Sequence, residues 1–458
     1  MNEKKGLNVI VILISLLLIL VGFQLPAKSK MNNIIIISVD TLRADHLGCY
    51  GYPLDTSPNI DAFSRDGVLF SNCYTLTPLT APSFSTMMTS LPPYKHGAKR
   101  NGLGIYKKVK TLAHFFKRYG FRTAAVISNW PLRKRLIKLH SGFDVYYEVF
   151  TKKRYLGIMN AEGEAPAVTR KVVKWLKKNH KKRFFLWVQY TDPHALYIQH
   201  KEFTFDYQHV KPSVYPPGTR MKKIKGYDSE IAFTDFYIGK FIKELKRLGL
   251  YNKALIIFHA DHGESFGEHN YFKHGRKLYN STLHVPLIIK LPYNRLKNTR
   301  RQDNVSLLDI GRTAFSALQL LPPSQMEGEN LFGEEASSVD RKILLETYGG
   351  VVHFRRNSKK FHLKIKPIRY GMLSGSFKLI YNLKNKTYEV YDLKGDPFET
   401  KNVFLQVLPQ VKGMKQTLSN KINQLTKYIK LNRMYQLHDA SLSKEDMEKL
   451  KALGYYEK

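Results

Sequence analysis

The sequence predicts an α/β protein with a large, mostly parallel sheet between helices and a small C-terminal antiparallel sheet with one helix. Two observations predict this class. Five apolar runs rich in β-branched residues have the length of buried strands, and helical segments lie between them. After residue 358, short strand-like runs replace this alternation. The chain has 458 residues, of which 43% are hydrophobic, so it can bury a sizeable core.

The strands expected in the large sheet cover residues 34–39, 123–127, 184–188, 255–258 and 285–289. The expected helices cover residues 111–119, 165–178 and 228–248. The first ends at Gly120 and the third at Gly249, and glycine commonly follows a helix end. Strands that alternate with helices in this way imply βαβ units, and hence parallel pairing.

The C-terminal pattern predicts strands at 361–365, 370–373, 377–381 and 389–392, with a Gly-Asp-Pro turn at 395–397 and a helix over 408–428. These runs are too short and too close together for βαβ units, so we expect an antiparallel sheet with the helix packed on it. The predicted organisation is an N-terminal segment 1–30, a main α/β domain 31–350 and a C-terminal subdomain 351–458.

The N-terminal segment has its own pattern. Lys4 and Lys5 precede an apolar run over residues 7–25, which is about long enough to cross a bilayer as a helix. We expect an uncleaved membrane anchor, with a cleaved signal peptide and a buried core helix as alternatives. The first two would export the rest of the chain, so we expect a protein on the periplasmic or extracytoplasmic face, anchored to the inner membrane.

The net charge is strongly positive, with 74 Lys and Arg against 37 Asp and Glu, or +37. This charge predicts an anionic partner, such as anionic lipid or a phosphorylated or sulfated substrate, unless the surface is uniformly basic without one partner. The basic runs lack interleaved aromatic platforms, so we expect no nucleic-acid partner. Cys49 and Cys73 are the only cysteines, which excludes a disulfide scaffold and a structural zinc module but allows one disulfide.

Acidic and imidazole side chains follow three of the predicted strands. Asp40 follows 34–39, Asp192 and His194 follow 184–188, and Asp261 and His262 follow 255–258. Ligands of open α/β sheets gather beyond the carboxyl ends of strands, so these groups can meet in one crevice. Oxygen and imidazole ligands suit one divalent ion among Ca²⁺, Mg²⁺, Mn²⁺ and Zn²⁺.

The segment 77–85 is typical of a loop that enters a helix, with Thr80 near its first residue and Pro82 in its first turn. A hydroxyl there faces the positive end of the helix, where an anion is favoured. An ordinary helix-capping threonine is the alternative interpretation of Thr80.

Several short motifs occur in one order along the chain. They include 37–45 with 48–52, 57–61, Thr80-Ala81-Pro82-Ser83, Lys95-His96-Gly97, Asp192-Pro193-His194, Asp261-His262-Gly263-Glu264, His274-Gly275, 391–393 and Leu453-Gly454-Tyr455. On these motifs the chain resembles the sulfatase family of the alkaline phosphatase superfamily, from Asn32 to the C-terminus. The resemblance implies the alkaline-phosphatase-like (sulfatase) fold.

The resemblance also implies roles for single residues. Asp40, Thr80, Asp261 and His262 would hold the metal, and Thr80 would also be the nucleophile. His194 would contact the substrate and protonate the leaving oxygen, and His274 would bind the substrate and assist catalysis. Asn129, in the segment where the family carries a lysine, is a further candidate for substrate binding.

The site departs from the family pattern in ways that bear on its chemistry. Threonine is not a recognised formylglycine precursor, so no formylglycine is expected at Thr80, and Phe84 replaces the arginine of the motif. Thr41 replaces a second aspartate, and Asn129 stands where a lysine is missing. A phosphorylated threonine can be discharged by attack at phosphorus, whereas a sulfated threonine is a poor intermediate.

These departures leave three hypotheses. The first is an exported, metal-dependent hydrolase that cleaves sulfate or phosphate esters through Thr80. The second is an envelope phosphotransferase of the phosphoethanolamine or glycerol-phosphate type. The third is a non-catalytic binding protein on a sulfatase-like scaffold.

Overall fold

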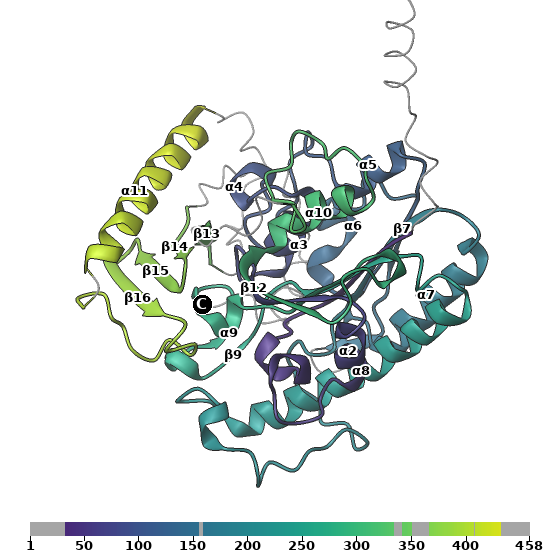
Figure 1. Ribbon diagram of the computed structural model, residues 1–458, viewed down its shortest axis with the longest axis horizontal. Helices are drawn as coiled ribbons and strands as arrows, with labels where there is room; N and C mark the ends of the chain where they lie inside the picture. Colours follow the sequence, from purple (N-terminus) through teal and green to yellow (C-terminus); the bar gives the residue numbers. More distant parts are fainter. Residues whose placement is uncertain (1–32, 155–158, 334–340, 350–365, 407, 432–458) are drawn as a thin grey trace, which may run out of the picture.

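The structure is a computed structural model that describes residues 33–154, 159–333, 341–349, 366–406 and 408–431 (Figure 1). The predicted segment 1–30, the predicted strand 361–365 and the motif 453–455 lie outside the described residues.

The described residues form an eight-stranded sheet at the centre of the molecule (Figure 1). Every pairing in it is parallel except the two made by β11, which runs opposite to both its neighbours. β1 consists of buried residues only and lies between β8 and β7. The strand order is β12 (Thr299–Ser306), β2 (Val68–Tyr74), β11 (Leu287–Lys290), β8 (Leu255–Ala260), β1 (Ile34–Val39), β7 (Phe184–Tyr190), β3 (Arg122–Ile127) and β4 (Val145–Glu148). The predicted mostly parallel sheet is therefore confirmed.

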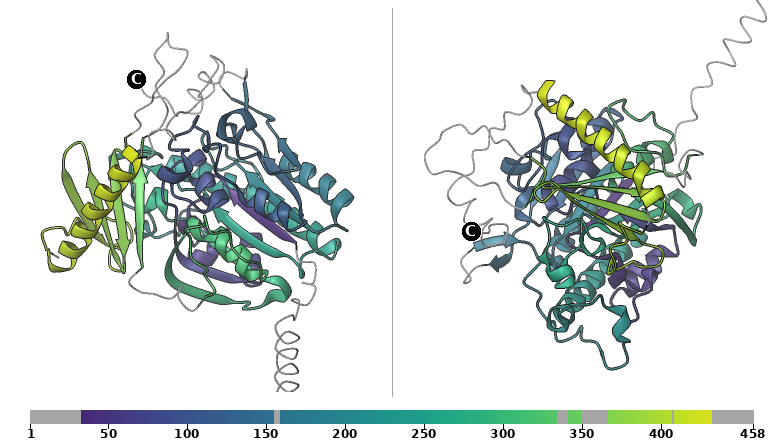
Figure 2. Two further views of the ribbon diagram at one scale, coloured as in Figure 1. Left: turned by 90° about the horizontal axis from the view of Figure 1, so that it is seen from above. Right: turned by 90° about the vertical axis from the view of Figure 1, so that its left-hand side faces the viewer.

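Helices cover both faces of this sheet (Figures 1 and 2). One layer contains α2 (Pro58–Ser64), α7 (Ala165–Asn179) and α8 (Met221–Arg247). The other contains α3 (Thr80–Thr89), α5 (Leu112–Arg118) and α10 (Ile310–Ala317). α7 shows how the sequence makes this layer, because its apolar residues Val168, Val172 and Leu176 recur at helical spacing and are all buried.

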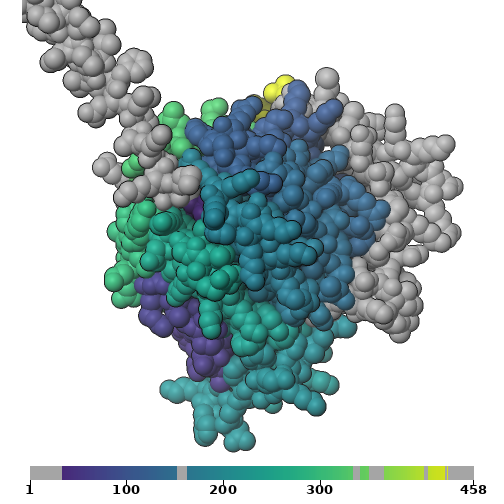
Figure 3. Space-filling view, turned by 90° about the vertical axis from the view of Figure 1, so that its right-hand side faces the viewer, coloured from purple at the N-terminus to yellow at the C-terminus, as the bar shows by residue number. Residues whose placement is uncertain are grey.

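α8 begins earlier than predicted, at Met221 rather than at 228. Gly226 interrupts the helical pattern of the sequence, but here the glycine permits a close contact. A Cβ on Gly226 would lie 2.7 Å from the carbonyl oxygen of Tyr197. The segment between β7 and α8 passes directly over the helix at this point, and a glycine leaves room for it. That segment projects from the lower edge of the molecule (Figures 1 and 3).

A smaller sheet lies beside the large one, with α11 (Leu408–Leu431) packed on it (Figure 2). Its four described strands are antiparallel and occur in chain order: β13 (Lys342–Thr347), β14 (Arg369–Ser374), β15 (Phe377–Asn382) and β16 (Thr387–Asp392). Leu379 and Val390 of the sheet pack with Val411 and Leu418 of α11. The predicted C-terminal sheet and helix are confirmed, and β13, which was not predicted, adds a strand from before residue 351.

Shorter elements complete the described chain. They are α4 (Pro93–His96), α6 (Lys134–Ile137), α9 (Asn280–Leu283), the pair β5 (Lys152–Arg154) and β6 (Met159–Glu162), and the pair β9 (Ser265–Phe266) and β10 (Phe272–Lys273). Cys49 and Cys73 are both free thiols, so the disulfide that the sequence allowed is not formed.

The prediction of a protein anchored in the inner membrane requires a correction. No helix in the described part of the chain is long and apolar enough to cross a bilayer. The segment 1–30, on which that prediction rested, lies outside the described residues.

Candidate active site

The site forms where two neighbouring parallel strands end. The last residues of β1 and β8, Val39 and Ala260, are paired in register. The chain therefore delivers Asp40 and Asp261 from adjacent positions at the carboxyl edge of the sheet. Ligand atoms of Asp40, Asp261 and His262 all lie within 4.8 Å of one another, and the three side chains are fully buried.

In each aspartate, one carboxylate oxygen accepts hydrogen bonds and the other accepts none from the described residues. Asp261 Oδ1 accepts hydrogen bonds from the backbone N–H groups of Thr41 at 3.1 Å and His262 at 2.8 Å. Asp40 Oδ2 accepts one from Asn129 Nδ2 at 2.5 Å. Asp40 Oδ1 and Asp261 Oδ2 have no hydrogen-bond partner among the described residues.

The imidazole of His262 completes this donor set. Its Nδ1 lies 2.9 Å from the carbonyl oxygen of Gly263, which can only accept, so Nδ1 carries the proton. Nε2 then offers a lone pair, 3.4 Å from Asp261 Oδ2 and 4.0 Å from Asp40 Oδ1.

The electrostatics of these groups favour a bound cation. Burial and the charges of Glu162 and Glu264 hold the pKa of Asp40 well above its usual range, although the hydrogen bond from Asn129 opposes the shift. Burial and Asp40 do the same to the pKa of Asp261. Burial and the nearby His274 hold the pKa of His262 well below its usual range, so this imidazole is neutral. Two buried carboxylate oxygens without partners and one neutral imidazole nitrogen therefore fit a divalent metal ion.

Thr80 lies at the edge of this donor set. It is the first residue of α3, is fully buried, and its Oγ1 lies 3.3 Å from His262 Nε2. Leu79 is the N-cap of the helix, so Thr80 is not an ordinary helix-capping residue. Asn101 instead accepts a hydrogen bond from the backbone N–H of Ala81 at 2.9 Å. Ser83 donates to the Asp261 carbonyl oxygen at 2.6 Å, which ties α3 to the candidate metal site.

Two further histidines, His194 and His274, lie near His262. His194 follows β7, and its Nδ1 lies 2.8 Å from Glu162 Oε1. His274 Nδ1 lies 3.1 Å from Glu264 Oε1, and Tyr197 donates its hydroxyl to Glu264 Oε2 at 2.8 Å. The ring of His274 lies between the other two, with centroids 5.5 Å from His194 and 4.3 Å from His262.

The structure thus brings together the seven residues to which the resemblance gave roles: Asp40, Thr80, Asn129, His194, Asp261, His262 and His274. Asp192 instead accepts a hydrogen bond from Ala165 N at 3.0 Å. Three further residues of the site, Glu162, Glu264 and Asn101, had no predicted role. Glu264 could have been found, because it belongs to the Asp261–Glu264 motif. Burial opposes its ionisation, but His274 and Tyr197 lower the pKa of this carboxyl below its usual value. Glu162 and Asn101 stand in no motif, and only the fold brings them to the site.

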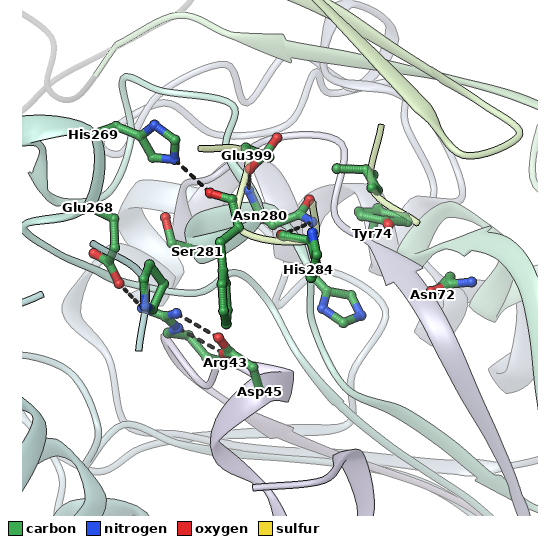
Figure 4. A pocket seen from close by; sticks show the side chains of 14 residues that line it. Arg43, Asp45, Asn72, Tyr74, Glu268, His269, Asn280, Ser281, His284 and Glu399 are labelled. Atoms are coloured by element: carbon green, nitrogen blue, oxygen red, sulfur yellow. Dashed lines mark hydrogen bonds and ion pairs between the residues drawn. The ribbon is translucent and has the colours of Figure 1, made fainter. Parts of the chain in front are cut away.

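A separate cavity of about 260 Å³ lies between Arg43, Glu268, His284 and Glu399 (Figure 4). None of the seven predicted site residues lines it. Arg43 fills one wall, where it pairs with Asp45 at 2.6 Å and Glu268 at 2.5 Å. The same guanidinium donates to the carbonyl oxygen of Glu264 at 3.1 Å. Arg43 therefore supports the backbone of the 261–264 segment, and the cavity itself contains none of the residues expected to react with the substrate.

Comparison with known protein families identifies two regions. The sulfatase model matches residues 32–320. The model for the C-terminal part of N-sulphoglucosamine sulphohydrolase matches residues 267–428. An arylsulfatase of Clostridium perfringens (strain 13 / Type A) is 23% identical over 447 residues, which cover 81% of this chain and 90% of the relative.

Solved structures share the fold. A protein in complex with its substrate, D-glucosamine-2-N,6-O-disulfate, superposes with a TM-score of 0.70 at 19% identity, covering 86% of this chain and 98% of that one. The phosphonate monoester hydrolase of Agrobacterium radiobacter superposes with a TM-score of 0.65 at 18% identity, covering 90% and 98%. The family model covers more than half of the sequence, and the fold agrees with it. The chain therefore belongs to the sulfatase family of hydrolases.

Proposed function

We propose that this protein hydrolyses sulfate or phosphate esters with Thr80 as the nucleophile beside a divalent metal ion. The observation that carries the proposal is the 3.3 Å distance from Thr80 Oγ1 to His262 Nε2. It places a buried hydroxyl next to the two unpartnered carboxylate oxygens of Asp40 and Asp261. Helix capping does not account for this hydroxyl, because Leu79 is the N-cap of α3.

Asp40, Asp261 and His262 would hold the metal ion. When bound, such an ion supplies Lewis acidity, which lowers the pKa of a neighbouring hydroxyl and offsets negative charge on an anionic ester. Thr80 loses its hydroxyl proton to solvent and forms a bond from Oγ1 to sulfur or phosphorus, while the bond to the leaving oxygen breaks. His194 protonates the leaving oxygen, and His274, whose ring centroid lies 5.5 Å from that of His194, binds the ester group. Water then cleaves the ester on Thr80 and releases the inorganic anion.

The identity of the central atom depends on two observations that point in different directions. The names of the relatives favour sulfate esters. The single hydroxyl of Thr80 favours phosphorus, because no second hydroxyl is present from which sulfate could be eliminated. Both esters therefore belong in the test.

The test compares Thr80→Ala with Thr86→Ala. Thr86 is a matched control, because it lies on the same helix, is almost fully buried, and contacts a histidine, His96, at 3.1 Å. Sulfate monoesters, phosphate monoesters, phosphate diesters and phosphonates are assayed with protein of measured metal content. We expect Thr80→Ala to lose turnover while it retains part of its metal, and Thr86→Ala to keep turnover.

Mass spectrometry of the Thr80 peptide after rapid quenching should show an added phosphate or sulfate group. Full activity of Thr80→Ala would refute the nucleophile assignment. A wild-type protein that binds metal but cleaves none of the esters would favour a binding function on this scaffold.

A further inference from the structure

The pair formed by Glu162 and His194 lies at the edge of the site and is shielded from solvent. Both side chains are 1% exposed. His194 Nδ1 lies 2.8 Å from Glu162 Oε1 and 3.2 Å from the carbonyl oxygen of Ala195. A carboxylate charge at this depth is stable only with a paired cation or strong hydrogen bonds, and His194 can supply both.

The contacts of His194 determine which of its nitrogens can exchange a proton. Both groups near Nδ1 are oxygens that accept hydrogen bonds, so Nδ1 carries a proton in either charge state of the ring. Nε2 is then the nitrogen that gains or loses a proton. It lies at the end of the ring away from Glu162.

The backbone around Glu162 is held on both sides. Its carbonyl oxygen accepts a hydrogen bond from Thr151 N at 2.8 Å, and Gly163 N donates to Ser128 O at 2.8 Å. A Cβ on Gly163 would lie 2.3 Å from the carbonyl oxygen of Val149, so only glycine allows this close approach. An isolated β-bridge also joins Glu162 to Asn129, whose side chain holds Asp40. The same segment thus fixes Glu162 relative to the candidate metal ligands.

We propose that Glu162 is a positioning residue that orients His194 as the proton donor to the leaving oxygen, an inference that rests on the proposed function. As the bond from sulfur or phosphorus to the leaving oxygen breaks, that oxygen takes the proton from His194 Nε2. The ring becomes neutral and keeps its proton on Nδ1, which lies 2.8 Å from Glu162 Oε1. Water that attacks the ester on Thr80 returns a proton to Nε2, so the ring is restored after each turnover.

The test uses two esters that differ only in the leaving group: an alkyl ester, which needs protonation, and a 2,4-dinitrophenyl ester, which does not. We expect Glu162→Ala to lower kcat for the alkyl ester roughly 100-fold and to change kcat for the dinitrophenyl ester by less than about threefold. Glu162→Gln keeps an acceptor for Nδ1–H, so it should recover part of the loss.

A double-mutant cycle tests whether Glu162 acts through His194. In a His194→Ala background, Glu162→Ala should have no further effect on the alkyl ester. Glu230→Gln is the matched control, because Glu230 is also buried and lies 3.0 Å from a histidine, His200, in another part of the chain. It should leave the ratio of the two kcat values unchanged.

Equal losses on both esters, or additive losses in the cycle, would overturn the positioning role while leaving Thr80 chemistry intact. The proposed function would fail differently: neither ester would be cleaved by the wild type, or Thr80→Ala would retain activity. Metal content and circular dichroism identify any variant that fails to fold, and the Glu162→Gln and His194→Ala variants then carry the test.

Discussion

Asn129 donates its side-chain N–H to Asp40 Oδ2 over 2.5 Å, so the amide holds one oxygen of the carboxylate and directs the other toward Asp261 and His262. The sequence predicted that Asn129 contacts the substrate. In the structure its amide N–H contacts a candidate metal ligand, and its contact with the substrate stays a prediction. Partners of this kind orient the ligands of metal sites and tune their affinity.

We therefore expect Asn129→Ala to weaken divalent metal binding about 10- to 100-fold, because Asp40 loses the group that orients it. Metal titration followed by calorimetry or elemental analysis measures the change. Asn179→Ala is the control, since Asn179 is also buried but donates to Trp175 O within α7. Equal metal affinity in the Asn129 and Asn179 variants would contradict the role assigned to Asn129.

Glu346 should make stability depend on pH. It lies buried in β13, where Oε2 accepts a hydrogen bond from the Tyr348 hydroxyl at 2.6 Å and Oε1 has no partner among the described residues. Burial raises the pKa of Glu346 from 4.5 to about 7, although Tyr348 and Lys99 oppose the shift. The folded state thus binds this proton more tightly than the unfolded chain. Its contribution is fully present below pH 4.5 and is lost as the pH rises through about 7.

Glu346→Gln removes this titration. From mildly acidic to mildly alkaline pH, the unfolding free energy of the wild type should fall by on the order of 3 kcal/mol relative to that of the variant. Denaturant unfolding of both proteins at each pH measures the change. A constant difference between the two proteins across this range would contradict the prediction.

Lys378 and Glu399 form a buried ion pair where the C-terminal sheet meets α9. Nζ lies 2.5 Å from Oε1, the side chains are 0% and 1% exposed, and Glu399 Oε2 also accepts from Asn280 N. Lys378→Met leaves the carboxylate without its cation, so we expect a loss of about 3–5 kcal/mol in unfolding free energy. The double variant Lys378→Met/Glu399→Gln should recover at least half of it. Arg247→Met, in an exposed pair with Glu244, should change stability little. A Lys378 variant as stable as the Arg247 variant would contradict the prediction.

The net charge of +37 should act on substrate capture rather than on chemistry. A positive field attracts an anionic ester over long range and is screened by salt. We expect kcat/KM to fall about tenfold between roughly 0.05 M and 0.5 M salt, with little change in kcat. A substrate with an additional anionic group should show the steeper fall. Salt-independent kcat/KM for both substrates would show that the field has no role in capture.

The sequence predicted the buried centre of the fold better than its edges. β1, β3, β7 and β8 are apolar runs because both of their faces are covered, and this pattern is visible in the sequence. β12 was missed because it is an edge strand whose sequence is almost entirely polar, and its exposed residues give no apolar signal. α8 was shortened because Gly226 reads as a helix breaker, while its contact with Tyr197 depends on tertiary structure.

The candidate site, like the fold, could be predicted from the sequence only in part. Asp40, Asp261 and His262 could be predicted because residues that follow parallel strands meet at one edge. Their partners could not, because Glu162 reaches His194 through a bridge between residues 33 positions apart in the sequence. A single glutamate outside any motif gives no indication in the sequence that it contacts a histidine.

The reversed direction of β11 makes the segment 261–286 one long connection between two neighbouring strands. β8 and β11 are antiparallel neighbours, with Leu287 paired to His259, so the chain leaves and re-enters the sheet at the same edge. The two joints are thus one strand spacing apart, and the chain between them carries His262, Glu264 and His274. The connection also contacts the small sheet and the chain that follows it, since Thr347 of β13 donates to Gly275 O and Glu399 accepts from Asn280 N. A graft of new ester specificity onto this scaffold would therefore have to replace this connection together with the small sheet that it contacts.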